Sequence, residues 1–150
     1  AMLASCTTLP GITSADKGPG LWLVPVNHTD RYAPNIVVDD AWAGNVSPQG
    51  GGGGAACCLG GRKDWSTPVK VTWRWGAEED PVTKVSTRPG EDRSAIVAFP
   101  GAPKRLNKSI KEKWSREDYM ADEAYLCVIF RSLDKVELAY SYSGSGCKHK

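Results

Sequence analysis

Strict alternation of apolar and polar residues constrains the fold of this chain more than any other feature. The segment VKVTWRW at 69–75 places apolar residues at every odd position and polar residues between them. A period of two sends successive side chains to opposite faces of a β-strand, so one set is predicted to be buried, Trp73 and Trp75 included. The segment VELAYSY at 136–142 repeats the pattern. Both segments predict strands with one face in a core.

Shorter apolar runs between turn-forming residues predict the remaining strands. These runs lie at 21–26, 36–42, 82–87, 94–99 and 125–130, with a further re-entry at 55–59. Sixteen glycines and ten prolines in 150 residues indicate many turns and few long helices. The prediction is a mainly β protein with one antiparallel, β-sandwich-like domain at 21–150. At most one short helix is expected, at 109–121, where an ordered loop is the alternative.

The start of the chain resembles the lipobox of bacterial lipoproteins. Residues 3–6 read LASC, an aliphatic residue and two small residues before Cys6. Small side chains fit a signal peptidase beside the cut bond, and the thiol of Cys6 would carry the lipid. Residues 1–20 are then a lipobox remnant and flexible tether, and the location is periplasmic, with the lipid in an envelope membrane. The alternative is an incidental thiol. No segment approaches the roughly 20 apolar residues of a membrane span.

The other four cysteines, an even number, are disulfide candidates in an oxidising compartment: Cys57, Cys58, Cys127 and Cys147. In an extended chain Cys57 and Cys58 point to opposite faces, so different fates are expected for them. One of the two is predicted to bridge to Cys147 and to pin the C-terminal tail. Cys127 lies in an apolar run, where a buried thiol is an equal alternative.

Charge and motif spacing argue against several function classes. The formal net charge of +2 is too balanced for a nucleic-acid partner. The basic residues at 104–113 predict a solvated loop, or else a patch that meets an acidic partner or lipid head groups. Adjacent Cys57 and Cys58 lack the spacing of zinc ligands, and the only histidines are His28 and His149. Neither a metal nor a cofactor is therefore predicted.

The sequence offers no residues in a pattern that is typical of an enzyme active site. A nucleophile elbow needs Gly-x-Ser-x-Gly, and the chain offers only Gly144-Ser145-Gly146 in its tail. The five glycines at 50–54 are not followed by the Lys-Ser/Thr pair of a phosphate-binding loop. They indicate a flexible loop or close packing of chain against chain. No catalytic residue is predicted.

Several segments in a fixed order resemble a known family. These are NHTDRY at 27–32, WAGNV at 42–46, the glycine run closing on Cys57-Cys58, Trp65, and the strand at 69–75. The order resembles a family of small proteobacterial lipoproteins described only as a domain of unknown function. Members are frequently encoded beside lipase effectors of the type VI secretion system, and several are regarded as their immunity proteins. The resemblance assigns no catalytic residues.

The function implied by the resemblance is the binding and neutralisation of a cognate secreted lipase or phospholipase. Such an inhibitor needs surface fit and a few buried anchors. The partner-binding candidates are Trp42, Trp65 and Trp114, which fall in loops or unassigned segments, and the acidic turn of Glu78, Glu79 and Asp80, which has no counterpart in the resemblance. The alternatives are a structural or assembly lipoprotein of the envelope and a ligand-binding β module that uses surface Trp and Tyr.

Overall fold

The computed structural model describes residues 20–104 and 122–150 and is mainly β. The described strands are β1 (Leu21–Asn27), β2 (Ala33–Val38), β3 (Ala41–Val46), β4 (Ala56–Leu59), β5 (Val69–Trp75), β6 (Glu78–Glu79), β7 (Ser86–Arg88), β8 (Glu91–Val97), β9 (Tyr125–Phe130) and β10 (Val136–Ser141). A short 3₁₀ helix, η2 (Ser145–His149), follows β10. The predicted helix at 109–121 lies outside the described residues.

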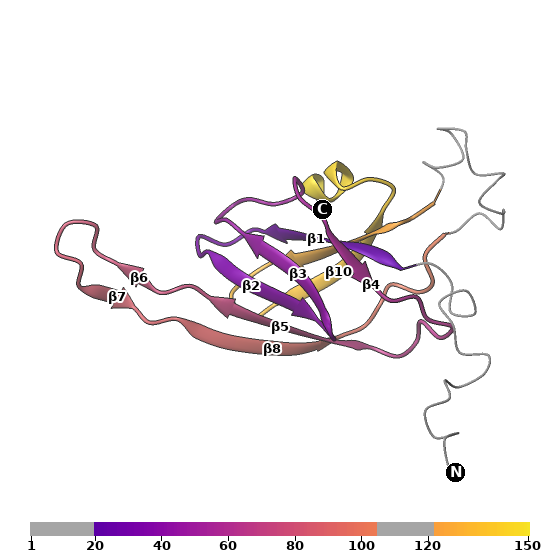
Figure 1. The fold of residues 1–150 in the computed structure, drawn as a ribbon, viewed down its shortest axis with the longest axis horizontal. Coiled ribbons are helices and arrows are strands. Elements are labelled where there is room, and N and C mark those ends of the chain that lie inside the picture. Colours follow the sequence, from indigo (N-terminus) through magenta and orange to yellow (C-terminus); the bar gives the residue numbers. More distant parts are fainter. Residues whose placement is uncertain (1–19, 105–121) are drawn as a thin grey trace, which may run out of the picture.

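Two four-stranded sheets stack into a sandwich, which confirms the predicted fold class (Figure 1). Sheet A has the order β10-β9-β1-β4, and sheet B has the order β3-β2-β5-β8. Trp73 and Trp75 of sheet B are 2% and 0% exposed, and both rings lie within 6 Å of the Phe130 ring of sheet A. The odd positions of β5 therefore fill the core as their alternation predicts.

Strand β1 lies inside sheet A, paired in parallel with β9 and antiparallel with β4. Both faces of β9 are buried. Val128 and Phe130 enter the sandwich core, whereas Cys127 and Ile129 join a second apolar cluster on the outer face of the sheet. Burial on both faces explains why the segment is a continuous apolar run rather than an alternating one.

The second cluster is covered by the C-terminal segment, and this determines the disulfide pairing. Cys147 of η2 is 0% exposed and bonds to Cys127 of β9, with 5.5 Å between the Cα atoms. The other disulfide joins the neighbours Cys57 and Cys58. The predicted bridge from Cys57 or Cys58 to Cys147 is therefore wrong, because β4 lies at the edge of sheet A and η2 packs over its middle strands.

The predicted strand at 36–42 is two strands. Asp39 and Asp40 form a turn between β2 and β3, and the φ of Asp39 is 52°, in the left-handed region. The turn is held to the next strand, because Asp39 N–H donates to Lys70 O at 2.8 Å and Asp39 Oδ1 accepts from Lys70 N–H at 2.9 Å. Trp42 therefore lies on edge strand β3 and not in a loop.

Close packing of chain against chain, one of the two predicted uses of the glycine run, is seen at Gly52. A Cβ on Gly52, whose φ is 76°, would lie 2.7 Å from the Cα of Lys148, so this glycine permits close packing of the chain against the C-terminal segment. Gly53 has open space around it. No helix in the described ranges is long and apolar enough to span a bilayer.

Candidate functional site

A hairpin arm projects from one end of the sandwich (Figure 1). We define the arm as residues 76–90, which continue β5 outward and return into β8. It contains the small sheet of β6 and β7. The predicted strand at 82–87 is therefore wrong in extent, since 81–83 form the turn and only Ser86–Arg88 pair as a strand. The described chain begins, in indigo, at the opposite end of the sandwich.

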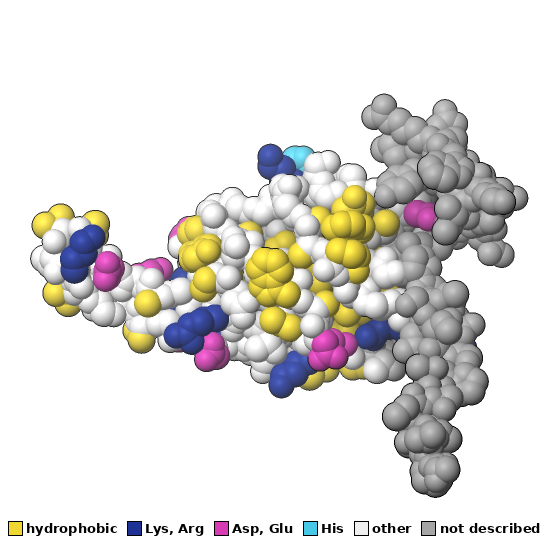
Figure 2. All heavy atoms as spheres, in the orientation of Figure 1, with side chains coloured by type: hydrophobic (Ala, Val, Ile, Leu, Met, Phe, Trp, Pro, Cys, Tyr) yellow, Lys and Arg dark blue, Asp and Glu magenta, His cyan; other side chains and the backbone are white. Residues whose placement is uncertain are grey.

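The tip of the arm exposes apolar side chains to solvent. Val82 is 87% exposed and Val85 is 63% exposed, and hydrophobic side chains gather at the far end of the arm in Figure 2. Both valines lie outside the core clusters. Their β-branched side chains explain the strand prediction, but the tip is too far from either large sheet to be packed.

Asp80 holds the turn at the tip. Its Oδ1 accepts hydrogen bonds from the backbone N–H groups of Val82 and Thr83, both at 2.8 Å. These bonds, that from Thr83 foremost, lower the pKa of Asp80 below its ordinary value. The three residues of the predicted acidic turn therefore have different roles. Asp80 shapes the tip, Glu78 pairs with Arg88 across the arm at 3.7 Å, and Glu79 is exposed.

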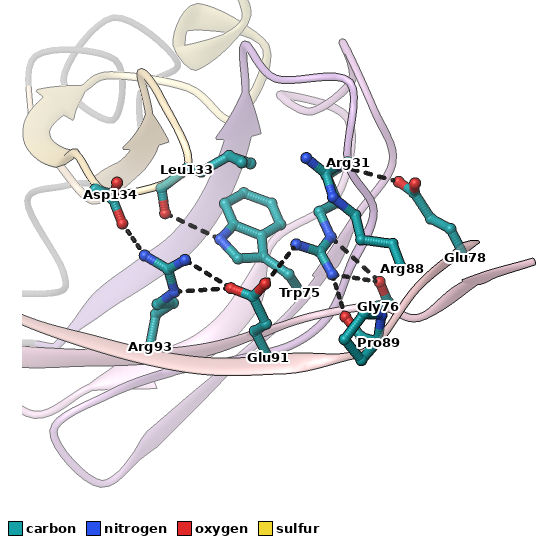
Figure 3. Close-up of polar contacts among 10 residues, drawn as sticks. All are labelled: Arg31, Trp75, Gly76, Glu78, Arg88, Pro89, Glu91, Arg93, Leu133 and Asp134. Carbon is teal, nitrogen blue, oxygen red and sulfur yellow. Dashed lines mark hydrogen bonds and ion pairs between the residues drawn. The ribbon is translucent and has the colours of Figure 1, made fainter. Parts of the chain in front are cut away.

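The root of the arm is held by one buried cation (Figure 3). Arg31 is 1% exposed, and its guanidinium donates to Gly76 O at 3.3 Å and also to Pro89 O. These carbonyls belong to the outgoing and returning sides of the arm. The same guanidinium forms an ion pair with Glu91 at 3.4 Å. A single side chain therefore ties both sides of the arm together where it leaves the sandwich.

The motif at 27–31 positions Arg31 for this task. Thr29 N–H donates to Asn27 Oδ1 at 2.9 Å, while Asn27 Nδ2 donates to Arg31 O at 2.6 Å. Asn27 and Thr29 are both buried, so these local bonds satisfy their polar groups and fix the turn. The turn directs the side chain of Arg31 inward, toward the arm, instead of into water.

A second set of contacts continues from Glu91 to sheet A. Arg93 donates to Glu91 Oε2 at 2.6 Å and pairs with Asp134 in the turn between β9 and β10. Hydrogen bonds from Arg93 first, and then from Arg31, lower the pKa of Glu91 below its ordinary value. Trp75 Nε1–H donates to Leu133 O of the same turn at 3.0 Å. The root of the arm is thereby connected to both sheets (Figure 3).

Trp42 marks a separate candidate surface. Its side chain is 57% exposed, and its Nε1–H donates to Asn35 Oδ1 at 3.0 Å. It lines a groove of about 490 Å³ between β3 and the glycine-rich loop, together with Gly53 and Gly54. The groove is open and lies along the edge of the sandwich, away from the residues of the arm.

The other predicted anchors are placed differently. Trp65 is half-buried and packs edge-on against Phe99, with 5.0 Å between ring centroids, and against Tyr140 at 6.3 Å. The ring of Trp65 therefore packs against other side chains of the protein. Its contact with a partner stays a prediction. Trp114 and Cys6 lie outside the described residues.

Sequence reasoning missed Arg31, Val82 and Val85 as site residues. An arginine in a polar turn has the sequence pattern of a surface residue, and nothing local indicates that the arm passes over it. Among residues 20–104 and 122–150, no three His, Cys, Asp or Glu side chains gather as metal ligands would. The arm projects as a convex surface that Arg31 fastens at its root, and such a projection is suited to insertion into a concave surface.

A family described as proteins of unknown function (DUF3304) matches residues 26–138. The match includes the turn at 27–31, the whole arm, and all strands from β2 to β9. No curated protein and no solved structure gives a significant match to the chain.

Proposed function

The chain belongs to this DUF3304 family of proteins of unknown function, and we propose that it is a lipid-anchored periplasmic protein that binds and neutralises a secreted lipase or phospholipase. It acts without chemistry of its own. Its activity is to occupy the surface that the lipase needs for its substrate. Two features motivate the partner and the location: the lipobox-like LASC segment, and the resemblance of the motifs between 27 and 75 to a family of small lipoproteins, several of which are regarded as immunity proteins.

The observation that carries the proposal is the braced arm. An isolated two-stranded hairpin is marginally stable in water, so an ordered arm needs support at its root. Here the support is a buried arginine with two carbonyl acceptors and a carboxylate partner. The arm adds little to the core, since the valines at its tip are left exposed. A solvent-exposed projection that is fastened at its root favours protein recognition, because it loses less conformational entropy on binding than an unsupported hairpin would.

The proposed location agrees with the direction of the arm. The described chain starts at Gly20, at the end of the sandwich opposite the arm (Figure 1). A lipid on Cys6 would attach the protein to the membrane through that end of the chain, so the attachment point would not cover the arm. The arm would then be accessible to a lipase.

The test uses the full chain and the secreted lipase that this proposal expects to be encoded beside it. Binding is measured by titration calorimetry, and lipid hydrolysis is measured on phospholipid vesicles with and without the protein. We expect a stable complex and loss of hydrolysis at equimolar protein. A secreted lipase from an unrelated gene pair serves as the control and should stay active. Absence of a complex at micromolar concentration would remove the proposal. A complex with an envelope component instead would favour the assembly-lipoprotein alternative.

The anchor is tested separately. Mass spectrometry of the native protein should find acyl chains on Cys6, and C6S should release the protein from the membrane fraction. Because the arm is distant from Gly20, the released variant should inhibit the lipase in solution as well as the parent does. An unmodified thiol at Cys6 would remove the proposed anchor but not the inhibition.

A further inference from the structure

We propose that the tip of the arm is the inhibitory element, and that Val82 and Val85 enter the apolar cleft in which the lipase holds an acyl chain. This inference rests on the proposed function and specifies its contact. Val82 and Val85 are not among the partner-binding candidates predicted from the sequence, which are the acidic turn and three tryptophans. The argument uses the shape of the arm, the chemistry of its tip and the charges along its sides.

Shape restricts the kind of surface that can receive the arm. The tip is a tight turn closed by Asp80, and the strands behind it are two and three residues long. Such short strands offer little backbone for pairing with another sheet edge. A flat partner would cover only one side of the tip and would leave part of the valine pair in water. A concave site encloses the tip on several sides, so it can bury both valines.

Chemistry restricts the floor of that site. Val82 and Val85 present apolar surface, and burying a valine fully is favourable by about 1.5–3 kcal/mol relative to exposure. A polar floor would lose its water without gaining partners. A lipase must hold the hydrocarbon of its substrate, and that requirement supplies an apolar cleft. Valine has one χ angle, so its burial costs little side-chain entropy.

The sides of the arm limit how far it can enter. Lys84 lies between the two valines in the exposed turn, and behind the tip the exposed Glu79 and the Glu78–Arg88 ion pair add further charged groups. Moving such groups into an apolar cleft is unfavourable, so Glu78, Glu79 and Arg88 stay at its rim, and the long apolar stem of Lys84 lets its ammonium group stay there as well. Two apolar side chains bordered by charged groups match the core and rim of a protein interface.

The test compares V82D/V85D with the matched control I96D. Ile96 is an aliphatic residue of β8 on the sandwich itself and is 68% exposed, close to the 63% of Val85. All three side chains lie in solvent, so the variants should fold, and equal urea midpoints check this. We expect V82D/V85D to bind the cognate lipase about 100-fold more weakly, in line with two buried anchors. I96D should bind as the parent does.

Competition identifies the cleft. A soluble short-chain ester substrate should raise the apparent inhibition constant of the parent protein in proportion to its concentration. Inhibition that is independent of ester concentration would overturn placement in the acyl cleft. Binding by V82D/V85D within threefold of the parent would overturn the inference while leaving the proposed function intact. A dimer of the protein alone that depends on these valines would overturn it in favour of self-association. If the parent does not bind the lipase, the proposed function fails, and this inference fails with it.

Discussion

Arg31 lies 3.4 Å from Glu91 at the root of the arm, and the two residues differ sharply in their access to water. The arginine side chain is 1% exposed and the glutamate side chain is 35% exposed. The ion pair therefore has one buried member, which is costly to leave without partners, and one member that water can reach. Several measurable consequences depend on this difference.

Replacing Arg31 with methionine should destabilise the protein by about 3 kcal/mol, the lower end of the range for breaking a buried pair. The value is at the lower end because water can solvate Glu91 after the change. Gly76 O and Pro89 O also lose their donor. Urea unfolding measures the loss. R74M is the control, since Arg74 pairs with Asp92 in solvent, and it should change stability by about 0.5 kcal/mol or less. Equal losses for the two variants would contradict the proposed bracing.

Acid should weaken the root of the arm through Glu91. Its lowered pKa means that the carboxylate contributes stability above the ordinary glutamate pKa of about 4.3. That contribution is lost as the pH falls through the lower value in the folded protein. The stability difference between the parent and E91Q should therefore be largest near neutral pH and should shrink in acid. Urea midpoints from pH 7 to pH 2 measure it, and a constant difference would argue against the assignment.

Removing the Cys127–Cys147 disulfide as C127A/C147A should cost about 3 kcal/mol in the chain-entropy model, because the bond closes a loop of 20 residues. C57A/C58A is the matched control. It removes a bond between neighbours, which closes no comparable loop, so the loss should be clearly smaller. Thermal or urea unfolding under oxidising conditions separates the two. A larger loss from C57A/C58A would show that chain entropy is not the main contribution.

Alanine at Gly52 should destabilise the protein by about 2 kcal/mol, because the new Cβ meets the backbone of Lys148 at 2.7 Å and φ is positive. G53A is the control, since nothing lies within 4 Å of a Cβ there and the stability should be nearly unchanged. Urea unfolding of both variants provides the comparison. Tolerance of G52A would mean that the C-terminal segment can shift away from the loop.

The sequence predicts best those strands in which the pattern of apolar and polar residues shows how many faces are buried. The bounds of β5 and β9 agree with the predicted segments, because alternation or a continuous apolar run reports directly on how many faces are covered. A single strand is predicted at 36–42 because the residues before and after Asp39 and Asp40 are both strand formers, and the turn at these two residues divides it. Pro25 lies inside sheet A, although proline in sheets is usually confined to edge strands and bulges. Its carbonyl accepts from Gly52 on the side where β4 has ended, so no strand there needs its missing N–H.

The candidate site is harder to predict from the sequence than the strands are, because it depends on contacts between segments that are distant in the chain. The pairing of Cys127 with Cys147 depends on which face of β9 the C-terminal segment covers. The role of Arg31 depends on an arm that begins 45 residues later. The exposed valines at the tip have the same local pattern as buried ones, so only the tertiary structure distinguishes them.

The parallel pairing of β1 with β9 has a consequence for biosynthesis. β1 is among the first described residues to be translated, yet it has no neighbour on that side until 125–130 have left the ribosome. Antiparallel β10 must follow before the sheet reaches its full width. An incomplete chain therefore carries an apolar strand with an open edge, and sheet A closes only after β9 and β10 have been synthesised.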